Sequence, residues 1–271
     1  MKIGVFDSGY GGLTILENIR QRLPQYDYIY LGDNARTPYG TRSFEVIYDY
    51  TLQCIKQLFA FNCQLIVVAC NTASARALRT IQQQDLPRLA PDRRVLGVIR
   101  PTAEQTGKLT VSRVAGLCAT DGTVQSGTYP VEIAKLFPDI TVVSEACPMW
   151  VPLIENNEHI HDGADYFVRR HIHRLFERDP RIDTLILGCT HYPLLLDKIV
   201  RYVPENVHII VQGNLVAESL AEYLVRHPEQ EIRCSKGGTV VYYTTESTEK
   251  FNASASVFLK QPIVAEHITI N

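Results

Sequence analysis

Two stretches decide the fold: LIVVACNT at residues 65–72 and LILGCTHY at residues 185–192. Each is a short apolar run, β-branched in part, that stops at a cysteine followed by residues able to form hydrogen bonds. A run of this length between polar residues is typical of a buried strand in a parallel sheet. Cys70 and Cys189 would then lie at the carboxyl ends of their strands, where open α/β sheets form ligand crevices. With one stretch in each half of the chain, the sequence predicts a single site with a thiol on either side.

The strands and loops of the first half recur in the same order in the second half. The first loop follows Asp7 in the first half and Ala119 in the second, and the last loop begins at Cys70 in the first half and at Cys189 in the second. The number of residues that separates corresponding loops is therefore nearly constant. We interpret this as an internal duplication with pseudo-twofold symmetry. The expected fold class is α/β, with two pseudo-symmetric lobes, each a mainly parallel sheet flanked by helices, and the active site between them. The elements after residue 207 are expected to return to the first lobe, which gives lobe one as 1–98 plus 208–271 and lobe two as 99–207.

The composition is that of a soluble globular protein, and it gives no reason to expect a strongly charged partner. Of 271 residues, 45% are hydrophobic and 21% are charged, and the formal net charge is −2. This charge favours neither nucleic acid nor an anionic membrane as a partner. Seven cysteines without CxxC spacing favour reduced thiols and a cytoplasmic protein. The sequence shows neither a lysine motif for pyridoxal phosphate nor a metal-ligand spacing, so no cofactor and no metal are expected.

Two thiols that face each other across a small molecule point to a particular reaction. One thiol alone, acting as its thiolate, would suggest a nucleophile. If a carbon atom lies between two thiols, one can remove a proton from one face while the other delivers a proton to the opposite face. This inverts the stereochemistry without a cofactor, as in a racemase or an epimerase. The carbanion-like transition state would need fixed N–H and hydroxyl donors in a site that excludes water.

Six motifs resemble those of the glutamate racemases, within the cofactor-independent aspartate/glutamate racemase superfamily. They are DSGYGG (7–12), GD with PYG (32–33 and 38–40), CNTAS (70–74), ATDGT (119–123), ACP through Glu155 (146–155) and GCTHYP (188–193). The resemblance implies two flavodoxin-like lobes with the substrate between them. It also implies interconversion of L- and D-glutamate, which supplies D-glutamate for bacterial peptidoglycan. It leaves the oligomeric state open, and a homodimer is one arrangement that it allows.

The resemblance further implies roles for individual residues. Cys70 and Cys189 are the two acid/base residues, the first for the proton of the D-enantiomer and the second for that of the L-enantiomer. Asp7 accompanies the first thiol, His191 accompanies the second, and Glu155 is a further acid in the second lobe. Asp7 and His191 are also expected to contact the substrate. The other expected substrate contacts are Ser8, Pro38, Tyr39, Gly40, Asn71, Thr72, Thr120, Thr123 and Thr190.

Two segments depart from the family pattern. After the fourth expected strand the family commonly has an acid and a glycine, where this chain has Arg100 and Thr102. Residues 212–214 read QGN, where an acidic start to the following helix is more usual. Both segments lie near the expected lobe boundary. They therefore bear on lobe packing, dimer geometry and regulation more than on the chemistry.

The sequence leaves other functions open. Aspartate or another amino acid is an alternative substrate within the same superfamily. A thiol redox or metal-binding module, with Cys70, Cys189 and His191 as ligands, is an alternative from another class, although the spacing differs from that of closed zinc sites. A separate histidine cluster is not expected to bind a metal, because side chains two residues apart on a helix diverge. It consists of His159, His161, His171 and His173.

Overall fold

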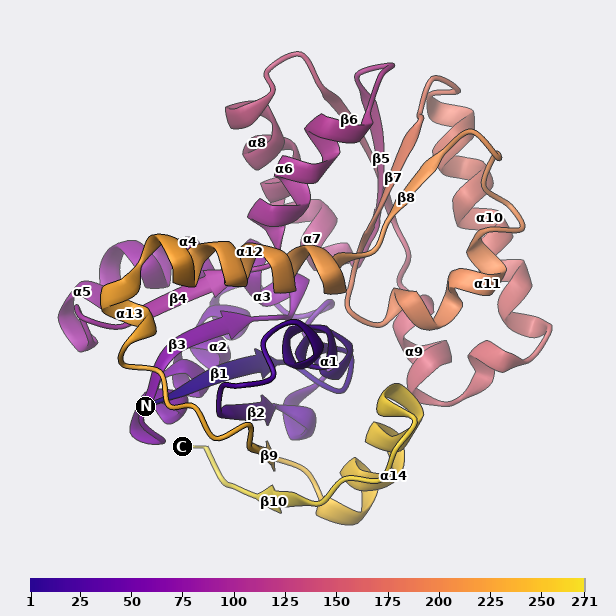
Figure 1. Cartoon of the computed structure of the whole chain (residues 1–271). Coiled ribbons are helices and arrows are strands. Elements are labelled where there is room, and N and C mark those ends of the chain that lie inside the picture. Colours follow the sequence, from indigo (N-terminus) through magenta and orange to yellow (C-terminus); the bar gives the residue numbers. More distant parts are fainter. Residues whose placement is uncertain (271) are drawn as a thin grey trace.

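The computed structural model describes residues 1–270 and contains two parallel sheets flanked by helices (Figure 1). Within this range the first sheet has six strands, in the order β10-β9-β2-β1-β3-β4. Its strands are β1 (Lys2–Asp7), β2 (Tyr28–Gly32), β3 (Cys63–Val68), β4 (Arg94–Gly97), β9 (Val240–Thr244) and β10 (Ala265–His267). Every residue of β2 and β3 is buried. Strands covered on both faces are mostly apolar, which is why residues 65–68 read as a continuous apolar run, and the one buried polar side chain of β3, Gln64, donates hydrogen bonds to Asp92 and Gln230.

The second sheet repeats part of the first. Its strands are β5 (Val114–Ala119), β6 (Thr141–Ala146), β7 (Thr184–Gly188) and β8 (His208–Ile210), in the order β6-β5-β7-β8. This order matches β2-β1-β3-β4 of the first sheet, as an internal duplication predicts. Neighbouring strands are parallel in both sheets, so the carboxyl ends of β1 and β3, and of β5 and β7, meet at one edge. The expected α/β fold class is confirmed.

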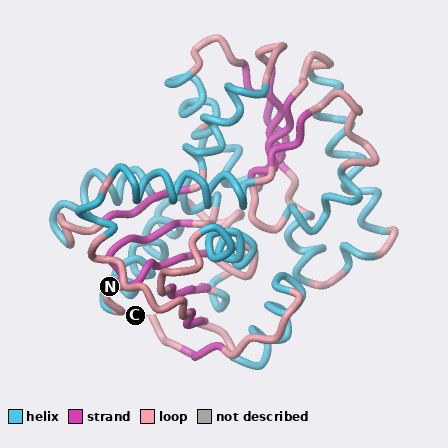
Figure 2. The backbone as a smooth tube through the Cα atoms, viewed as in Figure 1, coloured by secondary structure: helices cyan, strands magenta, loops and turns pink. Residues whose placement is uncertain are grey.

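Helices surround both groups of strands (Figure 2). The longest, α2, begins after Ser43, whose hydroxyl oxygen accepts a hydrogen bond from the N–H of Val46, and it buries one face that includes Ile47 and Leu58. Among residues 1–270, no helix combines the length and the apolar character that a membrane crossing needs. The helices are α1 (Gly12–Arg22), α2 (Phe44–Ala60), α3 (Asn71–Arg76), α4 (Leu78–Thr80), α5 (Leu86–Leu89), α6 (Ile99–Leu109), α7 (Asp121–Ser126), α8 (Thr128–Leu136), α9 (Trp150–Glu155), α10 (Gly163–Arg178), α11 (Leu196–Ile199), α12 (Gln212–Arg226), α13 (Pro228–Glu231) and α14 (Thr248–Leu259).

One expected helix is divided into short pieces. The sequence predicts a single helix from about Ala73 to Gln83, whereas the structure has α3, α4, a π-helical turn at Ile81–Asp85 and α5. Pro87 lies in the first turn of α5, where its missing N–H removes no helical hydrogen bond. A π turn widens the helix locally and shifts its register. The spacing of apolar residues therefore does not show where such a helix divides.

The chain crosses between the two sheets from β4 to α6 and again from β8 to α12. The strand expected over residues 207–211 is β8, but it pairs with β7 in the second sheet, whereas the sequence analysis assigned it to lobe one. Periodicity identifies a short strand without showing which sheet it joins. In Figure 1, α12 continues from β8 across the first sheet, and it packs against α1 and α6. We therefore propose a revised division, with lobe one as 1–98 plus 212–271 and lobe two as 99–211.

Candidate active site

Cys70 lies two residues beyond β3 and forms the N-cap of α3. Its sulfur accepts a hydrogen bond from the backbone N–H of Ala73 at 3.4 Å and lies 3.3 Å from the hydroxyl oxygen of Ser8. Ser8 follows β1, which pairs in parallel with β3, so both loops emerge at the same edge of the sheet. The structure thus brings together two residues that the sequence analysis placed in the site.

The thiol of Cys70 keeps its proton near neutral pH. Burial raises its pKa to about 12, and the negative charge of Asp7 acts in the same direction. The hydrogen bonds with Ser8 and with the N–H of Ala73 oppose this rise because they stabilise the thiolate. In the substrate-free site, Cys70 is therefore a proton donor.

Asp7 is the last residue of β1 and is completely buried. Its Oδ2 accepts a hydrogen bond from the backbone N–H of Gly9 at 3.0 Å. Burial raises the pKa of Asp7, while the charge of His191 and the backbone N–H groups of Gly12 and Gly9 act against the rise. A Cβ at Gly12 would lie 2.5 Å from the Cβ of Asp7. Glycine at this position lets the start of α1 approach the end of β1.

Cys189 follows β7 directly, and His191 lies two residues further on. The sulfur of Cys189 is 3.9 Å from Nδ1 of His191, and Nε2 of His191 is 3.1 Å from Oε1 of Glu155. The imidazole thus connects the second thiol to a carboxylate at the end of α9. Burial alone would lower the pKa of His191, but the interactions with Cys189 and Glu155 raise it to about 10. At neutral pH the imidazole is protonated and places a positive charge beside the sulfur.

Both sulfurs line one narrow cavity of about 70 Å³ between the two sheets. The expected residues in its lining are Ser8, Pro38, Tyr39, Gly40, Cys70, Asn71, Thr72, Thr120, Cys189, Thr190 and His191. Three expected residues lie outside the lining: Thr123 and Glu155 contact lining residues, and Asp7 immediately precedes Ser8. Six further lining residues were not predicted from the sequence: Thr37, Thr41, Asp121, Pro148, Val151 and Pro152. Each of them lies in or close to one of the six motifs, and this closeness was the signal that could have identified them.

Threonine hydroxyls join the two sides at the rim of this cavity. The hydroxyl oxygens of Thr72 and Thr120 are 2.9 Å apart, and Thr120 donates to the hydroxyl of Thr123 at 3.1 Å. Next to them, the N–H of Gly122 donates to the carbonyl of Gly40 at 2.8 Å. A Cβ at Gly40 would lie 2.9 Å from the Cβ of Thr120, so the close approach depends on glycine.

The side chain of Tyr39 is held within the first lobe. Its hydroxyl donates a hydrogen bond to the buried carboxylate of Asp33. The same carboxylate accepts hydrogen bonds from Arg36 at 2.7 Å and from Thr245 at 2.9 Å. These contacts hold the 38–40 loop in place. They leave the backbone of Tyr39 and Gly40, rather than the tyrosine hydroxyl, for contact with a substrate.

The described part of the chain contains no group of three or more His, Cys, Asp or Glu side chains placed to hold a metal ion. Two members of the histidine cluster are buried: Nδ1 of His171 lies 2.7 Å from Oε1 of Glu145, and His159 packs near α10. Their surroundings are those of structural histidines.

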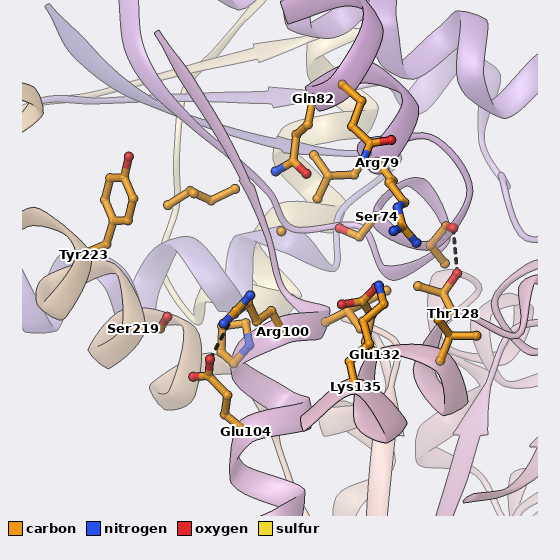
Figure 3. A pocket seen from close by; sticks show the side chains of 18 of the residues that line it. Ser74, Arg79, Gln82, Arg100, Glu104, Thr128, Glu132, Lys135, Ser219 and Tyr223 are labelled. Carbon is orange, nitrogen blue, oxygen red and sulfur yellow. Dashed lines mark hydrogen bonds and ion pairs between the residues drawn. The ribbon is translucent and has the colours of Figure 1, made fainter. Parts of the chain in front are cut away.

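A second, larger cavity of about 640 Å³ lies beside the crossings between the lobes (Figure 3). It is lined by side chains from α4, α6, α8 and α12, among them Arg79, Arg100, Lys135 and Ser219. In the figure, Arg100 points toward Glu104 on the same helix, and the two form an ion pair at 3.0 Å. Neither Cys70 nor Cys189 belongs to this lining, so the second cavity is separate from the thiol cavity.

Comparison with known proteins places this geometry in a family. The family described as Asp/Glu/Hydantoin racemase matches residues 10–218. The chain belongs to the Asp/Glu/hydantoin racemase family. One relative within this racemase family, the glutamate racemase of Roseobacter denitrificans, is 40% identical over 97% of this chain and 98% of its own length.

Solved racemase structures share the fold. The RacE1 isoform of glutamate racemase from Bacillus anthracis matches with a TM-score of 0.90 and 34% identity, covering 99% of this chain and 97% of that one. Glutamate racemase from Francisella tularensis, solved in complex with D-glutamate, matches with a TM-score of 0.88 and 32% identity, covering 100% of this chain and 98% of that one. The resemblance noted in the motifs is therefore confirmed along the full length of the chain.

Proposed function

We propose that this chain is an isomerase that interconverts L- and D-glutamate by proton transfer at Cα between Cys70 and Cys189. The observation that carries the proposal is that the two sulfurs, each following a strand of a different sheet, line one narrow cavity. Similarity to glutamate racemases over nearly the whole chain supports glutamate as the substrate.

In the L-to-D direction, the thiolate of Cys189 removes the α-proton and the thiol of Cys70 delivers its proton to the opposite face. The electron pair of the broken C–H bond forms the new C–H bond, so the step needs neither an oxidant nor a reductant. Two features support this assignment: Cys70 holds its proton at neutral pH, and the imidazolium of His191 faces the sulfur of Cys189. The L-to-D step leaves Cys70 as the thiolate and Cys189 as the thiol, and this form of the protein carries out the D-to-L step with the roles of the two sulfurs exchanged.

Three ionisable groups support the sulfurs in this proposal. The interaction with Cys189 and the 3.1 Å contact with Glu155 keep His191 protonated at neutral pH, so a negative charge on Cys189 has a cation beside it. Asp7, buried and with a raised pKa, can hold a proton next to Cys70 when the charge on that sulfur changes. These assignments agree with the roles that the motifs implied.

Neutral donors would bind the substrate and the charge that develops on it. Among the described residues that line the cavity, none is lysine or arginine. Hydroxyl and N–H groups fixed in a small cavity stabilise developing negative charge without having to reorganise. We assign this role to Ser8, Asn71, Thr72, Thr120, Thr190 and the backbone of residues 38–40, and we propose that Thr123, outside the lining, supports it through its contacts with Thr72 and Thr120.

We also propose a cellular context. The protein would work in the cytoplasm without a nucleic-acid or membrane partner, and its D-glutamate would serve peptidoglycan synthesis. A homodimer is part of this proposal, and light scattering of the purified protein at several concentrations tests it. A single mass equal to that of one chain at every concentration would exclude the dimer.

Aspartate is the alternative substrate, and circular dichroism of L-glutamate and L-aspartate solutions distinguishes the two. We expect the glutamate signal to decay to zero. Aspartate should react more slowly by about 10- to 200-fold, the range that one methylene group supplies in a fitted pocket. A Cys189→Ala variant is the control for non-enzymatic loss of signal. Faster turnover of aspartate than of glutamate would mean that aspartate is the substrate. No turnover of either amino acid would refute the proposed racemase function.

A further inference from the structure

Four buried polar side chains meet where the chain crosses between the lobes. Gln212 is the first residue of α12, directly after the second crossing, and Thr102 lies in the first turn of α6, directly after the first crossing. Tyr129 comes from α8, and Asn71 directly follows Cys70. All four side chains belong to residues that are at most 3% exposed. We call this group the crossing cluster.

The donors and acceptors of the crossing cluster match one another. The amide of Asn71 donates to Oε1 of Gln212 at 2.6 Å and accepts at Oδ1 from the hydroxyl of Tyr129 at 2.7 Å. Nε2 of Gln212 donates to the hydroxyls of Tyr129 at 2.7 Å and Thr102 at 2.9 Å. The hydroxyl of Thr102 in turn donates to the carbonyl of Val98 at 2.8 Å. Every member is neutral, so the cluster satisfies its buried polar groups without a buried charge.

The crossing cluster ties the Cys70 loop to the second lobe. Both polar atoms of the Asn71 side chain are engaged, so its amide cannot turn without breaking a buried hydrogen bond. Its partners Gln212 and Tyr129 come from different lobes in the revised division, and Asn71 itself lines the thiol cavity. Separation of the lobes would therefore break the hydrogen bond from Tyr129 to Asn71, and Asn71, the residue after Cys70, would be held within the cluster by Gln212 alone.

We propose that Gln212 is a positioning residue for the Cys70 half of the reaction, an inference that rests on the proposed racemase function. It acts through Asn71 and aligns the Cys70 loop when the lobes are closed. The two segments that depart from the family pattern thus meet in one hydrogen bond, between Thr102 and Gln212. Arg100, two residues before Thr102, instead lines the larger cavity and pairs with Glu104 (Figure 3).

Two variants test this role, each with a matched control. Tyr129→Phe and Gln212→Met remove hydrogen bonds of the crossing cluster with little change in shape. Tyr166→Phe on α10 and Gln84→Met in the π-helical turn make the same changes at exposed positions. We expect kcat/KM to fall by about tenfold in the two cluster variants, as for the loss of one hydrogen bond of ordinary strength. The control variants should retain the wild-type value.

The α-deuterium isotope effect on kcat/KM distinguishes positioning from a general loss of structure. Cys70 removes the α-deuteron of D-glutamate, and Cys189 removes that of L-glutamate. If the Cys70 step becomes slower, it limits the rate more strongly, so the isotope effect rises with D-glutamate and falls with L-glutamate. An isotope effect is a ratio of rates, so it does not depend on how much of a variant is folded.

The outcomes separate this inference from the proposed function. A wild-type protein that does not racemise glutamate would refute the proposed function. If the wild type is active but the isotope effects of Tyr129→Phe and Gln212→Met equal those of the control variants, the positioning role of Gln212 is refuted. A shift in the opposite sense would place the crossing cluster on the Cys189 side and would also refute it.

Discussion

Glu155→Gln tests how the Cys189 half of the site is charged, because it removes the carboxylate beside His191 and keeps the shape of the side chain. The pKa of His191 is raised from 6.5 to about 10. At about 1.36 kcal/mol per pKa unit, this rise corresponds to roughly 5 kcal/mol. Cys189 and Glu155 together cause this rise against the effect of burial, so the variant should lose part of these roughly 5 kcal/mol, and the pKa of His191 should move toward neutrality.

The sign of the pH effect follows from linkage. A histidine whose pKa is higher in the folded protein stabilises the fold fully below its unfolded pKa, near 6.5, and this stabilisation is lost as pH rises through about 10. Glu155→Gln should therefore lower the free energy of unfolding most at the acidic end of this window. Activity should also decline at a lower pH on the alkaline side, because the imidazolium beside Cys189 loses its proton earlier.

Two measurements check this prediction: kcat for L-glutamate against pH by circular dichroism, and urea unfolding across the same pH range. Glu145→Gln is the matched control, since Glu145 also pairs with a buried histidine, His171, and lies outside the thiol cavity. That control should lose stability but keep the wild-type decline of kcat at alkaline pH. If this decline lies at the wild-type pH in Glu155→Gln, or if it moves by the same amount in both variants, the role given to Glu155 is refuted.

Three further predictions follow from single contacts. Gly11→Ala would place a Cβ 2.3 Å from the hydroxyl oxygen of Thr190 and 2.6 Å from Nδ1 of His191. Activity should then fall on the order of 100-fold through misplacement of these groups, and unchanged kcat would contradict the contact. Cys70 should resist iodoacetamide at about pH 8 because its pKa is raised to about 12 and the thiolate is the reactive form; rapid labelling seen by peptide mass spectrometry would contradict this. Tyr39→Phe should lower the free energy of unfolding by about 1–3 kcal/mol in urea titration, because Asp33 loses a buried donor, while a raised KM at unchanged stability would show that the hydroxyl reaches the substrate.

Local sequence signals predicted the elements that carry the thiols. The apolar runs before Cys70 and Cys189 correspond to β3 and β7, because a buried parallel strand must be apolar on both faces. The β-branched and aromatic run VVYYT at residues 240–244 also predicts a strand, and it coincides with β9. Glycines and hydroxyl residues after the strands marked loops, and these loops line the thiol cavity.

The features that the sequence did not show depend on contacts between distant residues. It did not show that β8 joins the second sheet, because a short apolar strand carries no information about its partner. The helix α6 was missed because Pro101 in its first turn resembled a boundary, although proline is tolerated there. Thr102 and Gln212 were noticed as separate departures, and only the fold places them in hydrogen-bonding contact.

The early time course of L-glutamate racemisation in deuterium oxide tests the two-thiol account most directly. Cys189 removes the α-proton while Cys70, whose thiol exchanges with the solvent, delivers a deuteron to the other face. We therefore expect the first D-glutamate formed to carry deuterium at Cα while the remaining L-glutamate stays unlabelled. Deuterium appearing at the same rate in recovered L-glutamate and in D-glutamate would mean that one base serves both faces, and it would contradict the account.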